Sequence, residues 1–228
     1  MTEKADVSCF LEIPEKLTSQ LTKQISELDD LVNQVSALKV VASPSLRVHT
    51  AFEFMLCLAK LNVACSVDSI LKLHELIGKD GKIRGTENNI AIRGYHPAPA
   101  ENLEEILNAY VNIYSPKRSC EHPFLKIGGA YLSFALIHPF RDGNGRIGRL
   151  IAAWLMYAHN YGVLAPYLEP WLGNENKQHG KTFESKIQSY LAWCNPLFSN
   201  DLISYVEHFF SAFLQELTNK CRGILEKP

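Results

Sequence analysis

The chain has 228 residues, of which 46% are hydrophobic and 21% are charged. That length fits one large domain or two small ones, and the composition excludes a disordered or collagen-like chain. Lys and Arg number 23 against 24 Asp and Glu, so the formal charge is −1. A nucleic-acid-binding or membrane-surface protein is usually far more basic, so we expect neither nucleic acid nor a membrane as a partner.

The six cysteines show no spacing typical of a zinc site. We therefore expect reduced thiols in a reducing compartment. The N-terminus carries no apolar signal core. These features favour a cytoplasmic location, and export as an effector by another route stays open.

In the first half of the chain the apolar pattern predicts helices. Apolar residues recur at steps of three and four through the first forty residues, until Pro44 breaks the pattern. Helical patterning resumes over 46–62 and over 67–77, where Gly78 is a candidate C-cap. The first 45 residues thus read as an N-terminal helical extension.

Residues 79–99 are the one segment with β character. Glycines and prolines surround short alternating pieces there, which predicts a β-hairpin. Helical patterning then returns over several stretches. They are 103–111, 123–138, 150–158, 163–172, 182–194 and 200–221. The sequence predicts an all-α fold with one hairpin, and a single domain over 46–222 with its core at about 82–160.

Residues 138–149, HPFRDGNGRIGR, combine groups that suit phosphate chemistry. We expect Gly143 and Gly145 to adopt backbone conformations closed to other residues and to approach a ligand closely. The amides of such a turn, with the positive end of the helix that follows, form an anion site. Arg146 and Arg149 lie one turn apart, where both can bind further phosphate oxygens.

Two more side chains complete this predicted site. Asp142 is a hard oxygen ligand suited to Mg²⁺ that bridges phosphates. His138 belongs to the residue type whose ordinary pKa lies near neutrality, as a general base requires. The same letters match the dinucleotide fingerprint G-x-G-x-x-G, but no buried strand leads into Gly143. The pattern therefore predicts a site for nucleotide-phosphate transfer.

Every defined position of the signature H-P-F-x-[D/E]-G-N-G-R-x-x-R is present in residues 138–149. The segment thus resembles the signature of the Fic family, and the resemblance extends from about Lys82, more loosely to about Phe210. It implies a Fic-type helical bundle with a flap hairpin. It also implies a protein adenylyltransferase, which transfers AMP from ATP to a Tyr, Thr or Ser hydroxyl and releases pyrophosphate.

The resemblance also implies a role for each motif residue. His138 would accept the proton of the attacking hydroxyl, and Asp142 would hold Mg²⁺ across the α- and β-phosphates. Pro139 would fix the turn and Phe140 would anchor the loop in the core. Five residues would hold the phosphates: Gly143, Asn144, Gly145, Arg146 and Arg149.

The flap and the N-terminus carry the expectations about partners. Ile90 and Ile92 would pin a target segment that pairs with the flap. Residues 8–12 fit the first half of the family's inhibitory motif, which makes Glu12 a candidate brake, but Ile13 breaks the pattern. A separate inhibitor protein, no brake at all, and a homo-oligomer stay open.

Three other functions stay open on sequence alone. The same site would suit removal of AMP from a modified protein, or transfer from another nucleotide-linked donor. A catalytically idle interaction module usually loses the histidine or an arginine, and this chain retains all of them. We expect the histidines on helical patterns to be surface or satisfied core residues. They are His49, His74, His159, His179 and His208.

Overall fold

The computed structural model describes residues 15–37, 49–86, 97–116, 122–166 and 200–226, and every regular element in these ranges is a helix. The helices are α1 (Glu15–Ala37), α2 (His49–Lys60), α3 (Val67–Leu76), α4 (Leu103–Ile113), α5 (Pro123–Ile137), α6 (Asn144–Ala158) and α9 (Asn200–Leu225), with short 3₁₀ turns η3 (Ala100–Asn102) and η4 (Gly162–Leu164). The predicted all-α fold is confirmed. Over the described ranges, none of these helices has the length and apolar character to cross a membrane.

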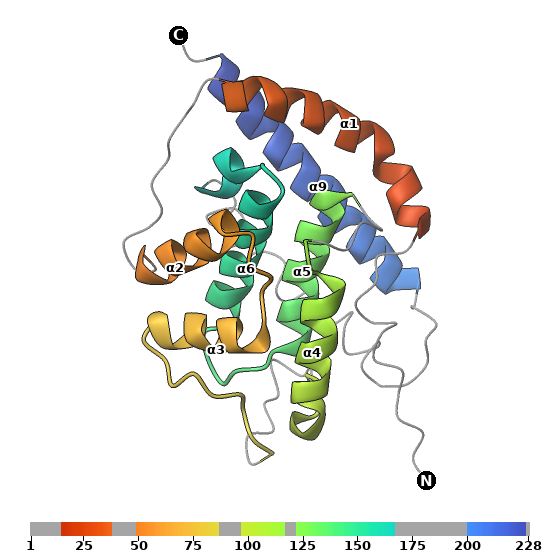
Figure 1. The fold of residues 1–228 in the computed structure, drawn as a ribbon. Coiled ribbons are helices and arrows are strands. Elements are labelled where there is room, and N and C mark those ends of the chain that lie inside the picture. Colours follow the sequence, from red (N-terminus) through yellow and green to blue (C-terminus); the bar gives the residue numbers. More distant parts are fainter. Residues whose placement is uncertain (1–14, 38–48, 87–96, 117–121, 167–199, 227–228) are drawn as a thin grey trace.

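Helices α5 and α6 form the centre of the bundle. They pack along each other, while α2 lies against α6 and α4 against α5 (Figure 1). Every residue from Leu150 to Met156 is buried, as the nearly all-apolar sequence of this stretch predicted. Pro123 occupies the first turn of α5, where its missing N–H costs no helical bond. The short loop 138–143 joins the two helices and carries the first half of the motif, and the second half, 144–149, begins α6.

Helices α1 and α9 lie side by side along one flank of this centre (Figure 1). The predicted apolar stripe of α1 is buried in the same continuous core as the rest of the bundle. Its members are Leu21, Ile25, Leu28, Val32 and Val35. The predicted domain boundary near residue 45 stays a prediction, because 38–48 lies outside the described ranges.

The ends of several helices agree with the sequence. The C-cap of α3 is Ile77, one residue before the predicted Gly78. Gly78 follows it with a φ of +81°, and its N–H donates to the Glu75 carbonyl at 2.8 Å, so it is the left-handed glycine that ends the helix. The helix expected over 163–172 starts as η4, and its remainder beyond residue 166 lies outside the described residues, as does the stretch 182–194.

The hairpin expected over 79–99 is not observed in the parts of it that are described. Residues 79–86 and 97–99 contain no strand. The intervening segment 87–96, with Ile90 and Ile92, lies outside the described residues, as does Glu12. Residues 79–86 are held instead by contacts of the Lys79 and Arg84 side chains with the loop between α5 and α6.

A polar contact fixes α1 against the rest of the bundle. His122 Nε2 lies 2.9 Å from Asp29 Oδ2, and the Tyr161 hydroxyl donates to Asp29 Oδ1 at 2.9 Å. His122 is also the N-cap of α5, since its Nδ1 accepts the Phe124 N–H at 3.4 Å. Nδ1 is therefore the acceptor and Nε2 the donor. Directional bonds thus orient α1 in addition to its apolar packing.

We expect Asp29→Ala to lower the free energy of unfolding by about 1–3 kcal/mol, because the donors of His122 and Tyr161 would lose their shared acceptor. Urea unfolding followed by circular dichroism measures the change. Asp30, the exposed neighbour on the same helix, provides the control, and Asp30→Ala should stay within about 0.5 kcal/mol of the parent. Equal midpoints for the two variants would show that the contact does not stabilise the fold.

Candidate active site

His138 ends α5 in a backbone conformation that is uncommon for a residue with a side chain. Its φ is +47° and its ψ is 59°, which is the left-handed region. Its N–H still donates to the Phe134 carbonyl at 3.0 Å, and Pro139 prevents the helix from continuing. The chain therefore leaves α5 at the residue where the sequence predicted the stop.

Two features of the structure favour the neutral form of the His138 imidazole. Its Nδ1 lies 3.3 Å from the Ala135 carbonyl oxygen, which only accepts, so Nδ1 carries the proton and Nε2 keeps its lone pair. Desolvation lowers the pKa of His138 to about 4; the bond to Ala135 opposes this shift, Arg84 adds to it and Asp142 opposes it. The neutral form with a lone pair on Nε2 is thus the dominant one at neutral pH.

Asn144 closes the loop that follows His138. Its side chain is almost fully buried, with 3% of the residue exposed. Its Oδ1 accepts the Phe140 N–H at 2.9 Å, and its Nδ2 donates to the Phe140 carbonyl at 2.7 Å. Phe140 is completely buried, which agrees with its expected role as an anchor. The sequence assigned Asn144 a role through its main-chain amide; the structure shows that its side chain holds the loop.

Gly143 is the residue at which the loop becomes a helix. Its φ is +89°, and a Cβ built on it would lie 3.0 Å from Ile77 Cδ1. Both the conformation and the close approach therefore require glycine there. Gly145 is different, because it lies inside the first turn of α6 and has no positive φ. The prediction of a special backbone conformation is correct for Gly143 and wrong for Gly145.

The start of α6 offers amides to an anion. Ile147 N–H bonds the Gly143 carbonyl at 3.0 Å, so the amides of Asn144, Gly145 and Arg146 precede the first helical bond and lie at the positive end of the helix. The Gly143 N–H already donates to Asp142 Oδ1 at 2.6 Å. Of the residues expected to hold phosphate, Gly143 therefore has its amide already engaged, and the amides at the helix start are those of Asn144, Gly145 and Arg146.

Asp142 places its carboxylate at the lip of the loop. Its Oδ2 lies 2.5 Å from Lys79 Nζ and 3.6 Å from Arg146 Nη2. The hydrogen bonds from Lys79 and from the Gly143 N–H lower the pKa of this exposed carboxyl. Arg149 follows one turn after Arg146 and is half-buried. The predicted acidic and basic groups thus gather at one end of α6.

The sequence predicted the carboxylate of Asp142 as a ligand for Mg²⁺. Across the described ranges, no group of three or more His, Cys, Asp or Glu side chains is arranged to hold a metal ion. Mg²⁺ in nucleotide sites is commonly held by one or two carboxylates together with phosphate oxygens. Asp142 therefore fits a magnesium site in which a nucleotide supplies further oxygens.

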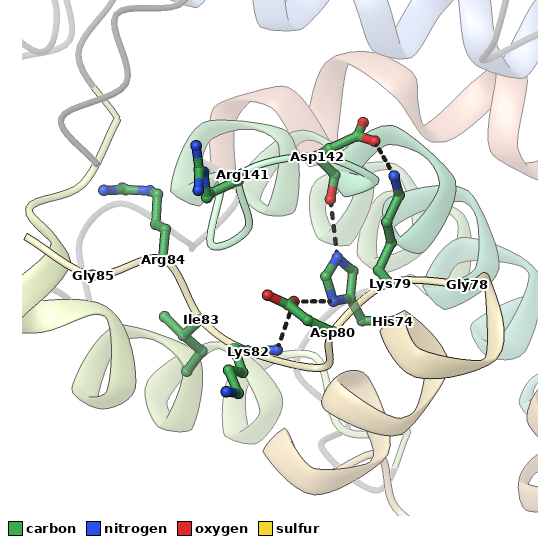
Figure 2. Close-up of a pocket in the computed structure, with 10 residues that line it drawn as sticks. All are labelled: His74, Gly78, Lys79, Asp80, Lys82, Ile83, Arg84, Gly85, Arg141 and Asp142. Atoms are coloured by element: carbon green, nitrogen blue, oxygen red, sulfur yellow. Dashed lines mark hydrogen bonds and ion pairs between the residues drawn. The ribbon is translucent and has the colours of Figure 1, made fainter. Parts of the chain in front are cut away.

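Residues 79–85 run over the loop and are bound to it. Arg84 is 5% exposed; its Nε donates to the His138 carbonyl at 2.9 Å and its backbone N–H to the Pro139 carbonyl at 2.9 Å. Its guanidinium also bonds the Ala98 carbonyl. This segment and the loop form a cleft of about 610 Å³, and its lining includes the exposed residues Lys82 and Arg141 (Figure 2).

The sequence analysis missed three residues that contact the motif loop: His74, Lys79 and Arg84. His74 is a satisfied core histidine, as expected, but it stacks on Phe140 with ring centroids 3.8 Å apart and an interplanar angle of 6°. Its place on the apolar face of α3, beside Leu73, was a usable signal, since a buried histidine needs polar partners. Lys79 and Arg84 carried no such signal.

Comparisons with known proteins match part of this chain to one family. Residues 64–156 match the Fic/DOC family. Among curated proteins, the chain is 29% identical over 133 residues to protein adenylyltransferase fic-1 of Caenorhabditis briggsae, a match that covers 51% of this chain and 26% of that protein. It is 26% identical over 136 residues to protein adenylyltransferase Fic of Nematostella vectensis, which covers 57% of this chain and 28% of that protein. The chain thus spans about a quarter of the length of these relatives.

Solved structures share the fold. A Fic domain-containing signalling protein from Bacteroides thetaiotaomicron superposes with a TM-score of 0.54 at 18% identity, over 95% of this chain and 92% of that one. Fic-1 (residues 134–508) from C. elegans gives a TM-score of 0.55 at 16% identity, over 92% of this chain and 75% of that one. At these identities the likeness concerns the fold alone.

We expect Asn144→Ala to cost about 2–4 kcal/mol of unfolding free energy, because the buried N–H and carbonyl of Phe140 would both lose their partner. Asn144→Asp should cost at least as much, since it directs a carboxylate at the Phe140 carbonyl. Guanidinium unfolding measures both variants, with the exposed neighbour Arg141→Ala as control. A cost below about 0.5 kcal/mol for Asn144→Ala would contradict the proposed hold on the loop.

The lowered pKa of His138 predicts how the stability of the fold depends on pH. Because the folded value of about 4 lies below the unfolded value of about 6.5, the unfolded chain binds the proton first. The His138 contribution to stability is therefore complete above pH 6.5 and is lost as the pH falls toward 4.

Histidine-edited NMR titration of the free protein should show His138 neutral at pH 6, with His138→Gln used to assign the signal. The same variant should flatten the fall in stability between pH 6.5 and pH 4. A midpoint for His138 near 6.5 would contradict the shift.

Proposed function

Because residues 64–156 match the Fic/DOC family, we propose that this chain transfers AMP from ATP to a Tyr, Thr or Ser hydroxyl of a target protein and releases pyrophosphate. The observation that carries the proposal is the imidazole of His138, whose Nδ1 is bonded to the Ala135 carbonyl so that Nε2 keeps its lone pair, six residues before the first amide of α6. Relatives named protein adenylyltransferase support the type of reaction.

In the proposed reaction, His138 is the general base. Its Nε2 takes the proton from the target hydroxyl while that oxygen forms a bond to the α-phosphorus of ATP. The bond between the α-phosphorus and the oxygen bridging to the β-phosphate breaks, and pyrophosphate leaves with that electron pair. A positioned base of this kind contributes about 10²- to 10⁴-fold to the rate.

The start of α6 would bind the negative charge of the triphosphate. The amides of Asn144, Gly145 and Arg146 lie at the positive end of the helix and donate to phosphate oxygens. The guanidinium groups of Arg146 and Arg149 hold the β- and γ-phosphates. This arrangement keeps the leaving group in line with the attacking oxygen. Gly143 supplies the turn in this scheme, since its own amide is engaged by Asp142.

Asp142 fits the one protein carboxylate of a magnesium site. Lys79, at 2.5 Å from Oδ2, would have to give up this carboxylate oxygen when the ion binds. Mg²⁺, when bound, would neutralise charge between the α- and β-phosphates. Because the ionised form of Asp142 is already favoured by Lys79 and Gly143, its carboxylate is ready to bind a cation at neutral pH.

The target would dock beside the cleft of Figure 2. Ile90 and Ile92 remain the proposed contacts of a flap that pairs with the target main chain, and residues 79–86 lead into that flap along the cleft. Inhibition of the transfer by Glu12 of the same chain, or by a separate inhibitor protein, stays a prediction. If Glu12→Gly leaves self-modification unchanged, Glu12 does not inhibit the enzyme.

The proposal is tested by incubating the full chain with Mg²⁺, a protein extract and ATP labelled at the α-phosphate. We expect label on protein, and AMP on Tyr, Thr or Ser by mass spectrometry. His138→Ala should reduce labelling about 100-fold or more, the share that a general base contributes. His49→Ala, at an exposed position at the start of α2, is the matched control and should label like the parent.

Parallel reactions separate the alternatives. Label from γ-labelled ATP would indicate phosphoryl transfer, and preference for another α-labelled nucleotide would change the donor. Loss of AMP from a pre-labelled protein would indicate the reverse activity. Equal labelling by the parent chain and His138→Ala would reject His138 as the base, and no transfer with any donor would leave an interaction module.

A further inference from the structure

We infer that His74 is a positioning residue for the proposed AMP transfer, because its ring holds the segment that starts at Gly81 and the motif loop in register with each other. The inference rests on the proposed function. His74 comes from α3, outside the motif, and the ring is buried with 3% of the residue exposed. It touches neither nucleotide nor target in the proposed reaction, so it acts through the loop.

The two ring nitrogens of His74 bind two different segments. The Gly81 N–H donates to Nδ1 at 3.2 Å, and Nε2 lies 3.0 Å from the Asp142 carbonyl oxygen. Since Nδ1 accepts, Nε2 carries the proton and donates to Asp142. Asp80 Oδ1 is 3.6 Å from Nδ1 and already accepts the Lys82 N–H. Figure 2 shows the ring between Asp142 of the loop and the segment that contains Asp80 and Lys82.

The faces and edges of the same ring fix the loop sterically. Phe140 stacks flat on the ring at 3.8 Å. Gly143 lies so close that a Cβ there would be 3.4 Å from Nε2. The ring therefore abuts the loop at Phe140, Asp142 and Gly143, the residues between the base and the start of α6. A shift of the loop by an ångström would break these contacts.

The segment from Gly81 to Arg84 is consequently tied to the loop at both of its ends. At one end, Gly81 reaches Asp142 through His74. At the other, Arg84 bonds the carbonyls of His138 and Pro139 directly. Residues 81–84, which precede the proposed flap, thus hold the main chain of His138, the proposed base, and, through His74, that of Asp142, the proposed magnesium ligand. Because a misplacement of about 1 Å can cost about 100-fold in rate, these ties matter for catalysis.

Three substitutions separate the parts of this arrangement. Glutamine places an amide near the position of Nε2, so His74→Gln keeps a donor for the Asp142 carbonyl. Asparagine places one near Nδ1, so His74→Asn keeps only the acceptor for Gly81. His74→Phe preserves the stack on Phe140 and removes both bonds. His49→Gln, at an exposed position at the start of α2, is the matched control.

We expect the kcat for α-labelled AMP transfer to fall about tenfold or more in His74→Phe, which loses both bonds, and by about threefold in His74→Gln and in His74→Asn, which each keep one of the two bonds. The KM for ATP should change by less than about threefold, since the phosphate-binding amides remain in place. A merely structural role predicts a different result, in which activity follows the melting temperature of each variant. Equal kcat in all variants, or losses that track thermal stability, would overturn the inference.

A second readout does not depend on activity. Histidine ¹⁵N spectra of the parent should show His74 as the neutral Nε2–H tautomer, and hydrogen exchange of the Gly81 amide should accelerate in His74→Phe but not in His74→Asn. The opposite tautomer would overturn the inference even if transfer occurs. If these signals are as expected but the parent chain transfers no nucleotide, the proposed function is wrong, and so is the role of His74 in catalysis. The bonds of His74 to Gly81 and Asp142 would still be demonstrated.

Discussion

The loop between α5 and α6 depends on one side-chain amide, that of Asn144, which satisfies both polar groups of the Phe140 main chain. Both residues are buried, so water does not compete for these bonds, and releasing them would leave unpaired groups in the interior. These two bonds therefore fix the shape of the turn. His138 stands at one end of it and the first amides of α6 at the other, so their relative placement is set by main chain.

The electrostatics of the site follow from this placement. His138 is desolvated and lies near the Arg84 guanidinium, and both effects disfavour the imidazolium. Negative charge brought to the start of α6 would act in the opposite sense and raise the pKa of His138. In the proposed reaction, the ability of the imidazole to hold a proton would thus be greatest with a nucleotide in place.

Sequence reasoning succeeded where the information is local. The apolar stripe of α1, the left-handed Gly78 that ends α3 and the position of Pro123 each follow from a periodicity or a conformational preference of nearby residues. It was incomplete at Asn144, because an amide-bearing residue in a glycine-rich turn suits both a ligand and the turn itself. It was wrong at Gly145, since glycine is permitted but not required in a helical turn.

The remaining site residues were beyond prediction for a physical reason. Lys79 reaches Asp142, and Arg84 reaches the carbonyls of His138 and Pro139, across more than fifty residues of chain. Such contacts exist only once the helices have packed, and no spacing within the motif encodes them. His74 was correctly expected to be a satisfied core residue, but the identity of its partners depends on tertiary structure alone.

The docking of α1 bears on how this fold can be dissected. The stretch that matches the family, residues 64–156, omits both α1 and α9, although the two helices supply a large part of the single core. It also omits Asp29, the acceptor that His122 uses at the start of α5. A fragment limited to residues 64–156 would expose the apolar surface that α1 and α9 cover, and such a surface favours self-association. The minimal folding unit is therefore larger than the unit that sequence similarity delineates.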